Sequence, residues 1–251
     1  MHIFFRTGTL AALSMQLVPA FVVAGTAMWD YQDGHGPADW SDLDAAYALC
    51  AKGTHQSPID IESVKAQPGR LNSLLTSYTP GPATITNNGR TIMVASHSAG
   101  GIHLDGEFYR LLQFHFHTPS ETRIDHKEYM MEMHMVHRSS KGRLAVVAVM
   151  LTSGSENKAL KAVFQQLPEE NGKPVALHAF DPTHLIPQPS GYFSYLGSLT
   201  TPPCAENVAW RVMENPVEIS NEQYAAFKKH YLRNARPVQP LNDRQIFKST
   251  Y

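Results

Sequence analysis

Hydrophobic and polar residues alternate along several stretches of the chain, a pattern that predicts β-strands with one face in a core. The clearest case is "ATITNNGRTIMVAS" (residues 83–96), where Asn88 and Gly89 interrupt the alternation and favour a hairpin turn. Three further strands are predicted over residues 107–117, 128–138 and 143–153. The last of them, "RLAVVAVMLTS", is apolar enough for burial on both faces.

Helical patterns are fewer. "SENKALKAVFQQL" (residues 155–167) predicts one helix, and a capping-box pattern from Ser220 to Gln223 predicts the start of another before "YAAFKKHYL". A short third helix is predicted within residues 42–53, ending at a glycine. The proline-containing and aromatic stretch 167–200 is predicted to form ordered loops over the sheet.

No repeat, low-complexity tract or linker divides residues 28–251, so we predict a single, mainly β (α+β) domain there. The chain has 251 residues, of which 43% are hydrophobic and 17% charged, with a formal net charge of −1. Such a balance offers no electrostatic basis for binding nucleic acid or an anionic membrane surface.

Residues 1–27 have a different pattern. Arg6 is followed by an apolar run and then by small residues near Ala24 and Ala27. This predicts a secretory signal peptide cleaved at about residue 24–27, and hence an exported protein that is periplasmic or secreted. An uncleaved anchor is the alternative, but Pro19 interrupts a run that is already short for spanning a bilayer.

Export bears on the two cysteines, Cys50 and Cys204, because an oxidising compartment permits a disulfide between them. Two free buried thiols are the alternative.

Histidines carry the candidate chemistry. In a strand, residues two apart share a face, so His115 and His117 of "QFHFH" point the same way. A pair of this kind is by itself more often structural than metal-binding. If the following strand returns antiparallel, however, His134 of "MEMHMVH" lies beside them. Three neutral imidazoles with one open position are typical of a catalytic zinc site.

Ligating imidazoles normally donate their second N–H to a neighbouring acceptor. Gln113 shares a strand face with His115, and Glu132 shares one with His134. Burying a carboxylate there requires a partner, which a ligating histidine would provide. The competing interpretation is an ordinary buried Glu–His pair.

The motifs "QFHFH", "MEMHMVH", "GSLTTPPC", "QSPIDI" and "RPVQPLNDRQI" resemble those of the α-class carbonic anhydrases, and the resemblance runs from Trp29 to about Phe247. Asp30 stands where that family usually has glycine. The resemblance implies a large twisted, mostly antiparallel central sheet with a few short peripheral helices. It implies an enzyme that binds one Zn²⁺ per chain at His115, His117 and His134. The implied reaction is reversible hydration of CO₂ to bicarbonate and a proton, by attack of zinc-bound hydroxide.

The same resemblance assigns roles to residues that their own pattern would leave unremarked. Thr200 would accept a hydrogen bond from the hydroxide and donate its proton to Glu121. The backbone carbonyl of Asn234 would hold His117, as Gln113 and Glu132 would hold the other two ligands. Ser57-Pro58 and Pro202-Pro203 match peptide bonds that the family builds in cis. The residues implied to line the CO₂ pocket are Val136, Val146, Leu199, Thr201 and Trp210.

One position departs from the family. Many members carry a proton-shuttling histidine where this chain has Arg90, and an arginine stays protonated at any relevant pH. Met93, nearby, replaces a usually polar residue. We therefore expect proton export to limit turnover at low buffer concentration. His35 and His103 are candidate substitutes that the sequence does not place near the site.

Two other functions remain open at this stage: a catalytically silent binding module, and a zinc hydrolase acting on esters. Intact ligands argue against the first, and no added substrate-binding feature supports the second. Sulfonamides and small anions are the expected inhibitors, and the predicted state is a monomer or a homodimer.

Overall fold

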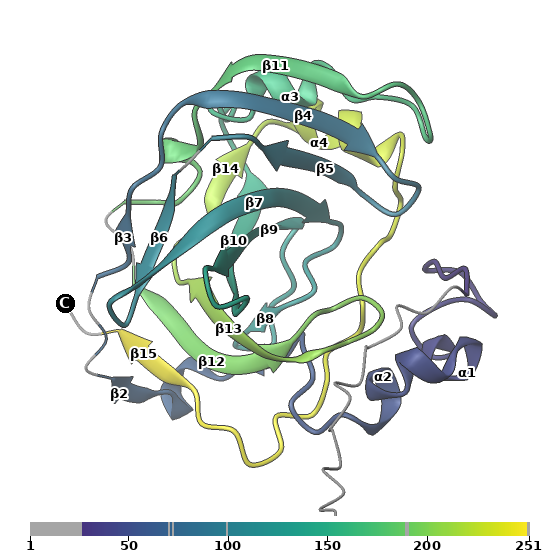
Figure 1. Ribbon diagram of the computed structural model, residues 1–251, viewed down its shortest axis with the longest axis vertical. Coiled ribbons are helices and arrows are strands. Elements are labelled where there is room, and N and C mark those ends of the chain that lie inside the picture. Colours follow the sequence, from purple (N-terminus) through teal and green to yellow (C-terminus); the bar gives the residue numbers. More distant parts are fainter. Residues whose placement is uncertain (1–26, 70, 72, 99, 189–190, 250–251) are drawn as a thin grey trace, which may run out of the picture.

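A computed structural model gives the architecture of the chain and describes residues 27–69, 71, 73–98, 100–188 and 191–249 (Figure 1). The predicted signal peptide therefore lies outside the described residues, apart from its last position.

One twisted sheet of thirteen strands dominates the molecule (Figure 1). In order across the sheet lie β11 (Val175–Phe180), β4 (Gly81–Asn87), β5 (Ile92–Ser96), β7 (Glu107–His117), β9 (Met131–Ser139), β10 (Leu144–Ser153), β13 (Glu206–Met213), β12 (Tyr192–Ser198), β15 (Phe247–Ser249) and β2 (Gln67–Gly69). Off this path, β14 (Val217–Ile219) pairs with β10, and β6 (Gly101–Leu104) pairs with both β7 and β3 (Leu75–Thr76). A separate two-stranded sheet joins β1 (Asp60–Ile61) to β8 (Arg123–Ile124).

Most neighbouring strands are antiparallel, which confirms the predicted fold class. The β4–β5 hairpin turns at Asn88 and Gly89 as predicted, with Gly89 at φ +79°. Parallel pairs are the exceptions, chiefly β10 with β13 and with β14. β10 is buried along nearly its whole length because the sheet has an apolar core on each face. Val147 and Val149 enter one core, and Val146 and Ala148 enter the other.

Helices are short and peripheral. They are α1 (Trp40–Leu43), α2 (Leu49–Lys52), α3 (Lys161–Phe164) and α4 (Asn221–Lys228), with single 3₁₀ turns η1 (Ala45–Tyr47), η2 (Ser63–Lys65) and η3 (Pro182–His184). α4 has the predicted capping box between Ser220 and Gln223.

The helix predicted over residues 155–167 is wrong in extent, because only α3 is helical. The backbone of Asn157 instead makes two hydrogen bonds with the side chain of Gln223: its N–H donates to Gln223 Oε1 at 2.8 Å, and its carbonyl accepts from Gln223 Nε2 at 2.9 Å. These tertiary bonds outweigh local helix propensity.

The helix predicted within residues 42–53 is likewise broken into pieces. Asp44 is extended, and its side chain accepts from the N–H of Ala46, starting η1. The final piece, α2, does end at Gly53.

The prediction that residues 167–200 are loops is also wrong in part, since they contain β11 and β12. β11 pairs with β4, which is distant in sequence, and β12 pairs with the next strand, β13, on one side and with the distant β15 on the other. Such pairing is a tertiary property that a local pattern does not report.

Cys50 and Cys204 form the disulfide permitted by the sequence, within a third apolar cluster that includes Trp40 and Tyr47. In the described ranges, no helix has the length and apolar character needed to cross a bilayer.

Candidate metal centre

The three candidate ligands lie on the two central strands β7 and β9. These strands are antiparallel, and their register places His115 directly opposite His134. His117 lies two residues further along β7 and therefore on the same face. The intervening Phe114 and Phe116 point into the opposite core, so strand alternation alone separates the ligands from apolar packing.

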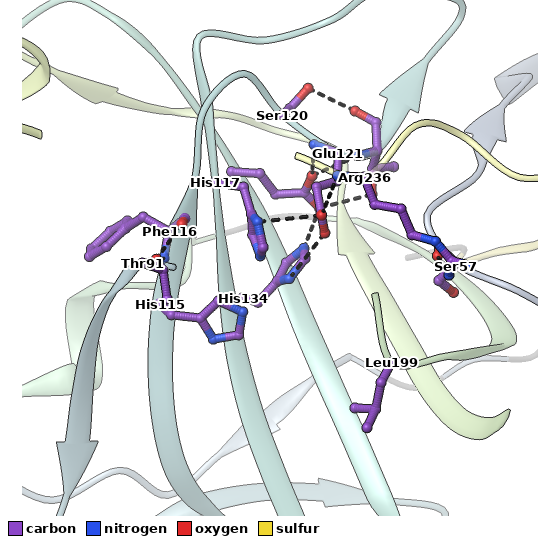
Figure 2. A network of polar contacts seen from close by, with 12 residues as sticks. Ser57, Thr91, His115, Phe116, His117, Ser120, Glu121, His134, Leu199 and Arg236 are labelled. Carbon is purple, nitrogen blue, oxygen red and sulfur yellow. Dashed lines mark hydrogen bonds and ion pairs between the residues drawn. The ribbon is translucent and has the colours of Figure 1, made fainter. Parts of the chain in front are cut away.

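The imidazoles converge. One ring nitrogen from each of His115, His117 and His134 lies within 4.8 Å of the others. The ring centroids of His117 and His134 are 4.6 Å apart, and His115 is 5.0 Å from one and 5.3 Å from the other. Figure 2 shows the three side chains directed toward one region. Among the described residues, these three histidines form the group of side chains that could hold a metal ion.

The second nitrogen of each ring has its own partner. His115 Nδ1 lies 2.9 Å from Gln113 Oε1, and His134 Nε2 lies 2.9 Å from Glu132 Oε1. His117 Nδ1 lies 2.8 Å from the carbonyl oxygen of Asn234. All three contacts expected from the sequence and the resemblance are present. They leave Nε2 of His115, Nε2 of His117 and Nδ1 of His134 for a ligand.

These remaining nitrogens suit a metal. His117 Nε2 is buried and has no hydrogen-bond partner within the described chain, an arrangement that is costly unless something binds it. Burial lowers the pKa of His117, and burial and the two neighbouring imidazoles lower that of His115 well below its usual range. Both rings are therefore neutral near pH 7, the form in which imidazole binds metal ions.

Glu132 anchors the β9 side of the centre. Its carboxylate is fully buried and accepts hydrogen bonds from the backbone N–H groups of Glu121 (2.8 Å) and Thr122 (2.7 Å). It also accepts from the Thr122 hydroxyl at 2.8 Å. Burial acts to raise the pKa of Glu132, but His134 and these donors outweigh it and hold the pKa below its usual value. Glu132 is thus a carboxylate that both orients His134 and shapes the loop carrying Glu121.

Glu121 lies next to the three imidazoles. Its Oε1 accepts from the backbone N–H of Arg236 at 2.8 Å and lies 3.4 Å from His117 Nδ1 (Figure 2). Its Oε2 is buried, has no hydrogen-bond partner among the residues that the structure describes, and lies 3.9 Å from His134 Nδ1. Burial is the largest influence and raises the pKa of Glu121 to about 7.

Thr200 is buried beside that carboxyl, and its side chain is among the groups that lower the pKa of Glu121. Glu121 Oε2 has no hydrogen-bond partner within 3.5 Å among the described residues. The Thr200 hydroxyl is therefore close to the carboxyl without being hydrogen-bonded to that oxygen. The structure therefore brings together the pair that the resemblance suggested.

A buried network supports both residues, and sequence reasoning missed its two central members. Arg236, whose backbone holds Glu121, donates through its side chain to Gln56 Oε1 (2.9 Å), the Ser57 carbonyl (2.7 Å) and the Cys50 carbonyl (2.8 Å). Gln56 in turn donates to the Cys204 carbonyl at 3.0 Å, just after the loop that carries Thr200. The motifs "RPVQP" and "QSPIDI" contain these residues, but nothing in their local pattern indicates that they meet.

Proline geometry completes the loops. Ser57-Pro58 and Pro202-Pro203 are cis, as the resemblance implied, and Thr118-Pro119 is a third cis bond that was not predicted.

The expected apolar wall is present as a cluster. Val146 and Trp210 are buried in it, and Val136 and Leu199 pack against it half-buried. The Trp210 ring stands edge-on to His134 at 5.0 Å, which brings this wall to the centre. Thr201 is half-buried in the adjoining loop.

Arg90 is held by the N-terminal segment. Its Nε donates to the Trp29 carbonyl at 2.9 Å, and its guanidinium lies 4.2 Å from the Trp29 ring. Its own carbonyl accepts from the side chain of Asn234, whose backbone holds His117.

The other residues that the sequence analysis connected with proton transfer lie in different parts of the molecule. Met93 is the β5 residue paired with His115. His103 pairs with Phe108, about 24 Å along β7 from His115 at 3.4 Å per residue, and is therefore remote from the centre. His35 is exposed in the N-terminal segment.

Comparisons with known proteins agree with this geometry. The family model for eukaryotic-type carbonic anhydrase matches residues 35–250. The chain belongs to that family. It is 40% identical over 231 residues to a carbonic anhydrase from Nostoc, covering 90% of this chain and 88% of the relative. It is also 40% identical to one from Klebsiella pneumoniae, covering 95% and 97%.

Solved structures extend the match. An α-carbonic anhydrase from Thermovibrio ammonificans, in complex with the inhibitor sulfanilamide, superposes with a TM-score of 0.86 at 42% identity, covering 89% of this chain and all of that one. Dioscorin, solved with ascorbate, is similar at 29% identity and a TM-score of 0.83, covering 88% and 97%. Family and fold together support an enzyme that hydrates CO₂.

Proposed function

We propose that the chain catalyses the reversible hydration of CO₂ to bicarbonate and a proton, with one zinc ion held by His115, His117 and His134. The observation that carries the proposal is the set of three imidazoles, two buried and that of His115 half-buried, each with one nitrogen engaged by the protein and one directed to a shared point. When bound there, zinc supplies the Lewis acidity that makes hydroxide available as a nucleophile near neutral pH.

Thr200 and Glu121 orient the nucleophile. The Thr200 hydroxyl accepts a hydrogen bond from the hydroxide and donates its own proton to Glu121, which directs a lone pair toward the substrate carbon. This relay requires Glu121 to be a carboxylate. Burial is the largest of the influences that together raise the pKa of Glu121 to about 7, and a cation at the adjacent imidazoles lowers it again.

The apolar wall binds the substrate. CO₂ has no net dipole and no hydrogen-bond donor, so a surface formed by Val136, Val146, Leu199 and Trp210 accepts it without desolvating a polar group. Thr201, half-buried and next to Thr200 in the chain, is proposed to contribute to the same pocket.

Proton export is the slow part of the cycle. A guanidinium group is a poor proton relay, and that of Arg90 is held by the carbonyl and ring of Trp29. Small buffers from solution therefore carry the proton away.

We further propose that the protein is exported, because a disulfide is typical of an oxidising compartment and the N-terminal pattern is that of a signal peptide. Sulfonamides and small anions are the expected inhibitors, in line with the sulfanilamide complex of the Thermovibrio relative. Cleavage at about residue 24–27 and a monomeric or homodimeric state remain predictions.

Stopped-flow CO₂ hydration with metal analysis tests the proposal. Active protein should contain one zinc per chain and lose activity with a sulfonamide. The variant His134→Ala should lose both zinc and activity, whereas His178→Ala, an exposed histidine on β11, should retain both.

Two outcomes distinguish the competing functions. A zinc-loaded protein without hydration activity would favour a silent binding module, for which dioscorin offers a relative of the same fold named with a different ligand. Ester hydrolysis exceeding CO₂ hydration in kcat/KM would favour a hydrolase.

A further inference from the structure

A cavity lies mainly on the face of β13 that points away from the three imidazoles, although Leu144 and Tyr195 of its lining belong to the apolar cluster of the other face. Trp210 packs against His134, so its neighbour Arg211 points to the other side of the sheet. There a cavity of about 600 Å³ opens between the ends of β7, β10, β12 and β13 and the segment preceding β15. Its volume is within the range of small-molecule sites.

Apolar side chains form much of its wall. They are contributed by Leu71, Tyr109, Leu144, Leu196 and Phe247. Strand register aligns Phe247, Ser194 and Arg211 in one row across β15, β12 and β13. Leu196 stands at the mouth, with 57% of its surface exposed.

Arg211 forms the floor and is only 6% exposed. Its Nη1 donates to the Trp210 carbonyl at 2.9 Å, whereas its Nε is buried with no hydrogen-bond partner among the described residues. The carboxylate closest to its Nη2 belongs to Asp105, at 4.0 Å, on a side chain that is 91% exposed. A buried guanidinium with unused donors is costly, since those donors gave up water on folding.

The other charged groups of the cavity are engaged or lie at its rim. Arg244 donates through all three guanidinium nitrogens to backbone carbonyls. Arg143 pairs with Glu107. The side chain of Asp243 is 86% exposed. Within the described wall, Arg211 is thus the cation whose donors are available to a ligand.

We propose that this cavity binds a small organic carboxylate with an apolar body, held by the Nε and Nη2 of Arg211. Those two donors match the two oxygens of a carboxylate in parallel hydrogen bonds. The apolar walls then bury the hydrocarbon part of the ligand. Exposed Asp105 and Asp243 at the rim disfavour multiply charged anions. The proposal does not depend on the proposed function, because it concerns the opposite face of the sheet.

Binding of hexanoate to the zinc-loaded protein tests this site. Ligand-observed NMR titration is carried out with the metal centre saturated by a sulfonamide and repeated on zinc-depleted protein, so that binding to the metal is separated from binding to the cavity. Hexanoate should bind in both states, and hexan-1-ol and hexylamine of the same length should bind about tenfold more weakly or worse.

Substitutions locate the binding. Arg211→Gln should weaken hexanoate by about tenfold or more, whereas Arg110→Gln, at an exposed arginine on β7, should leave it unchanged. Leu196→Glu places a competing carboxylate at the exposed mouth without disturbing the core and should also weaken binding. Leu232→Glu, at an apolar residue that is 76% exposed elsewhere, is its matched control.

Four results would overturn the proposal: no hexanoate binding to the wild-type protein, equal binding of hexan-1-ol, binding abolished by the sulfonamide, or full binding to folded Arg211→Gln. Thermal unfolding establishes that each variant is folded. If Arg211→Gln does not fold, full binding to Leu196→Glu overturns the proposal in its place.

Discussion

The two sides of the proposed active site are held by contacts of different range. On one side, His115 and His134 face each other across adjacent strands, and His117 follows from strand alternation. Their supporting partners Gln113 and Glu132 lie two residues away on the same strands. This side is built almost wholly from a single pair of neighbouring strands.

On the other side, Glu121 and Thr200 depend on segments far apart in the chain. Arg236 links Glu121 to the Cys50 carbonyl, and Gln56 links Arg236 to the segment after Thr200. The contrast shows that metal binding and orientation of the nucleophile rest on largely different contacts, which meet at Glu132. A change made away from Glu132 should therefore affect one side more than the other.

The largest difference between metal binding and orientation of the nucleophile is expected when the disulfide is removed. Its sulfurs join residues 154 positions apart, for which the chain-entropy model gives about 5 kcal/mol of stability. Cys50→Ala combined with Cys204→Ala should lower the free energy of unfolding by up to about that amount, measured with urea. Folded protein should still bind zinc stoichiometrically, but its kcat should fall because the Thr200 segment has lost its brace. Zinc loss from folded protein, or an unchanged kcat, would contradict the separation.

A pH-dependent effect is expected where the two sides meet. The pKa of Glu121 is raised from 4.5 to about 7, so between these values the folded zinc-free protein keeps a proton that the unfolded chain has released. Its contribution to stability is complete below pH 4.5 and is lost as the pH rises through 7. The loss amounts to about 3 kcal/mol.

Glu121→Gln removes this dependence while leaving the other titrating groups in place. The difference in free energy of unfolding between the zinc-free wild type and the variant should therefore fall across that pH range, and zinc should flatten it. Parallel pH profiles for the two proteins would show that Glu121 does not titrate in this way.

A smaller effect is expected on replacing the residues that hold the ligand histidines, and the loss of zinc affinity should depend on which residue is replaced. Glu132 is buried and holds three donors besides His134, whereas Gln113 is half-buried, so that water can replace it. Glu132→Ala should weaken zinc binding by about 10- to 100-fold, and Gln113→Ala by less. Competition with a chromophoric chelator measures both affinities. Equal losses would mean that burial of the support does not matter.

The smallest change, in the dependence of kcat on buffer concentration, is expected on replacing Arg90. Raising the concentration of an imidazole buffer should increase kcat by a few-fold, and Arg90→His should reduce this dependence by supplying a titratable group. Arg138→His, at an exposed arginine on β9, is the control. If kcat does not respond to buffer concentration, proton export is not limiting.

Much of the fold follows from the alternation of hydrophobic and polar residues, and most errors of the sequence prediction come from tertiary contacts. The strands carrying the histidines, the β4–β5 turn and the α4 cap were predicted because each is specified by neighbouring residues. The helix over residues 155–167 was wrong because Gln223 captures the backbone of Asn157. β11 was missed because it pairs with the distant β4, and β12 because its strand character depends on pairing with both β13 and the distant β15.

By itself, the sequence determined which imidazoles share a face and which polar residues lie beside them, since a period of two is a local property of the chain. Only the tertiary structure decided that Arg236 and Gln56 join Glu121 to the Thr200 segment. It also decided that the carbonyl and ring of Trp29 hold the Arg90 side chain, and that Arg211 is buried beneath a cavity. Those arrangements arise from contacts between segments remote in sequence, where hydrogen-bond geometry and burial act and local patterning carries no information.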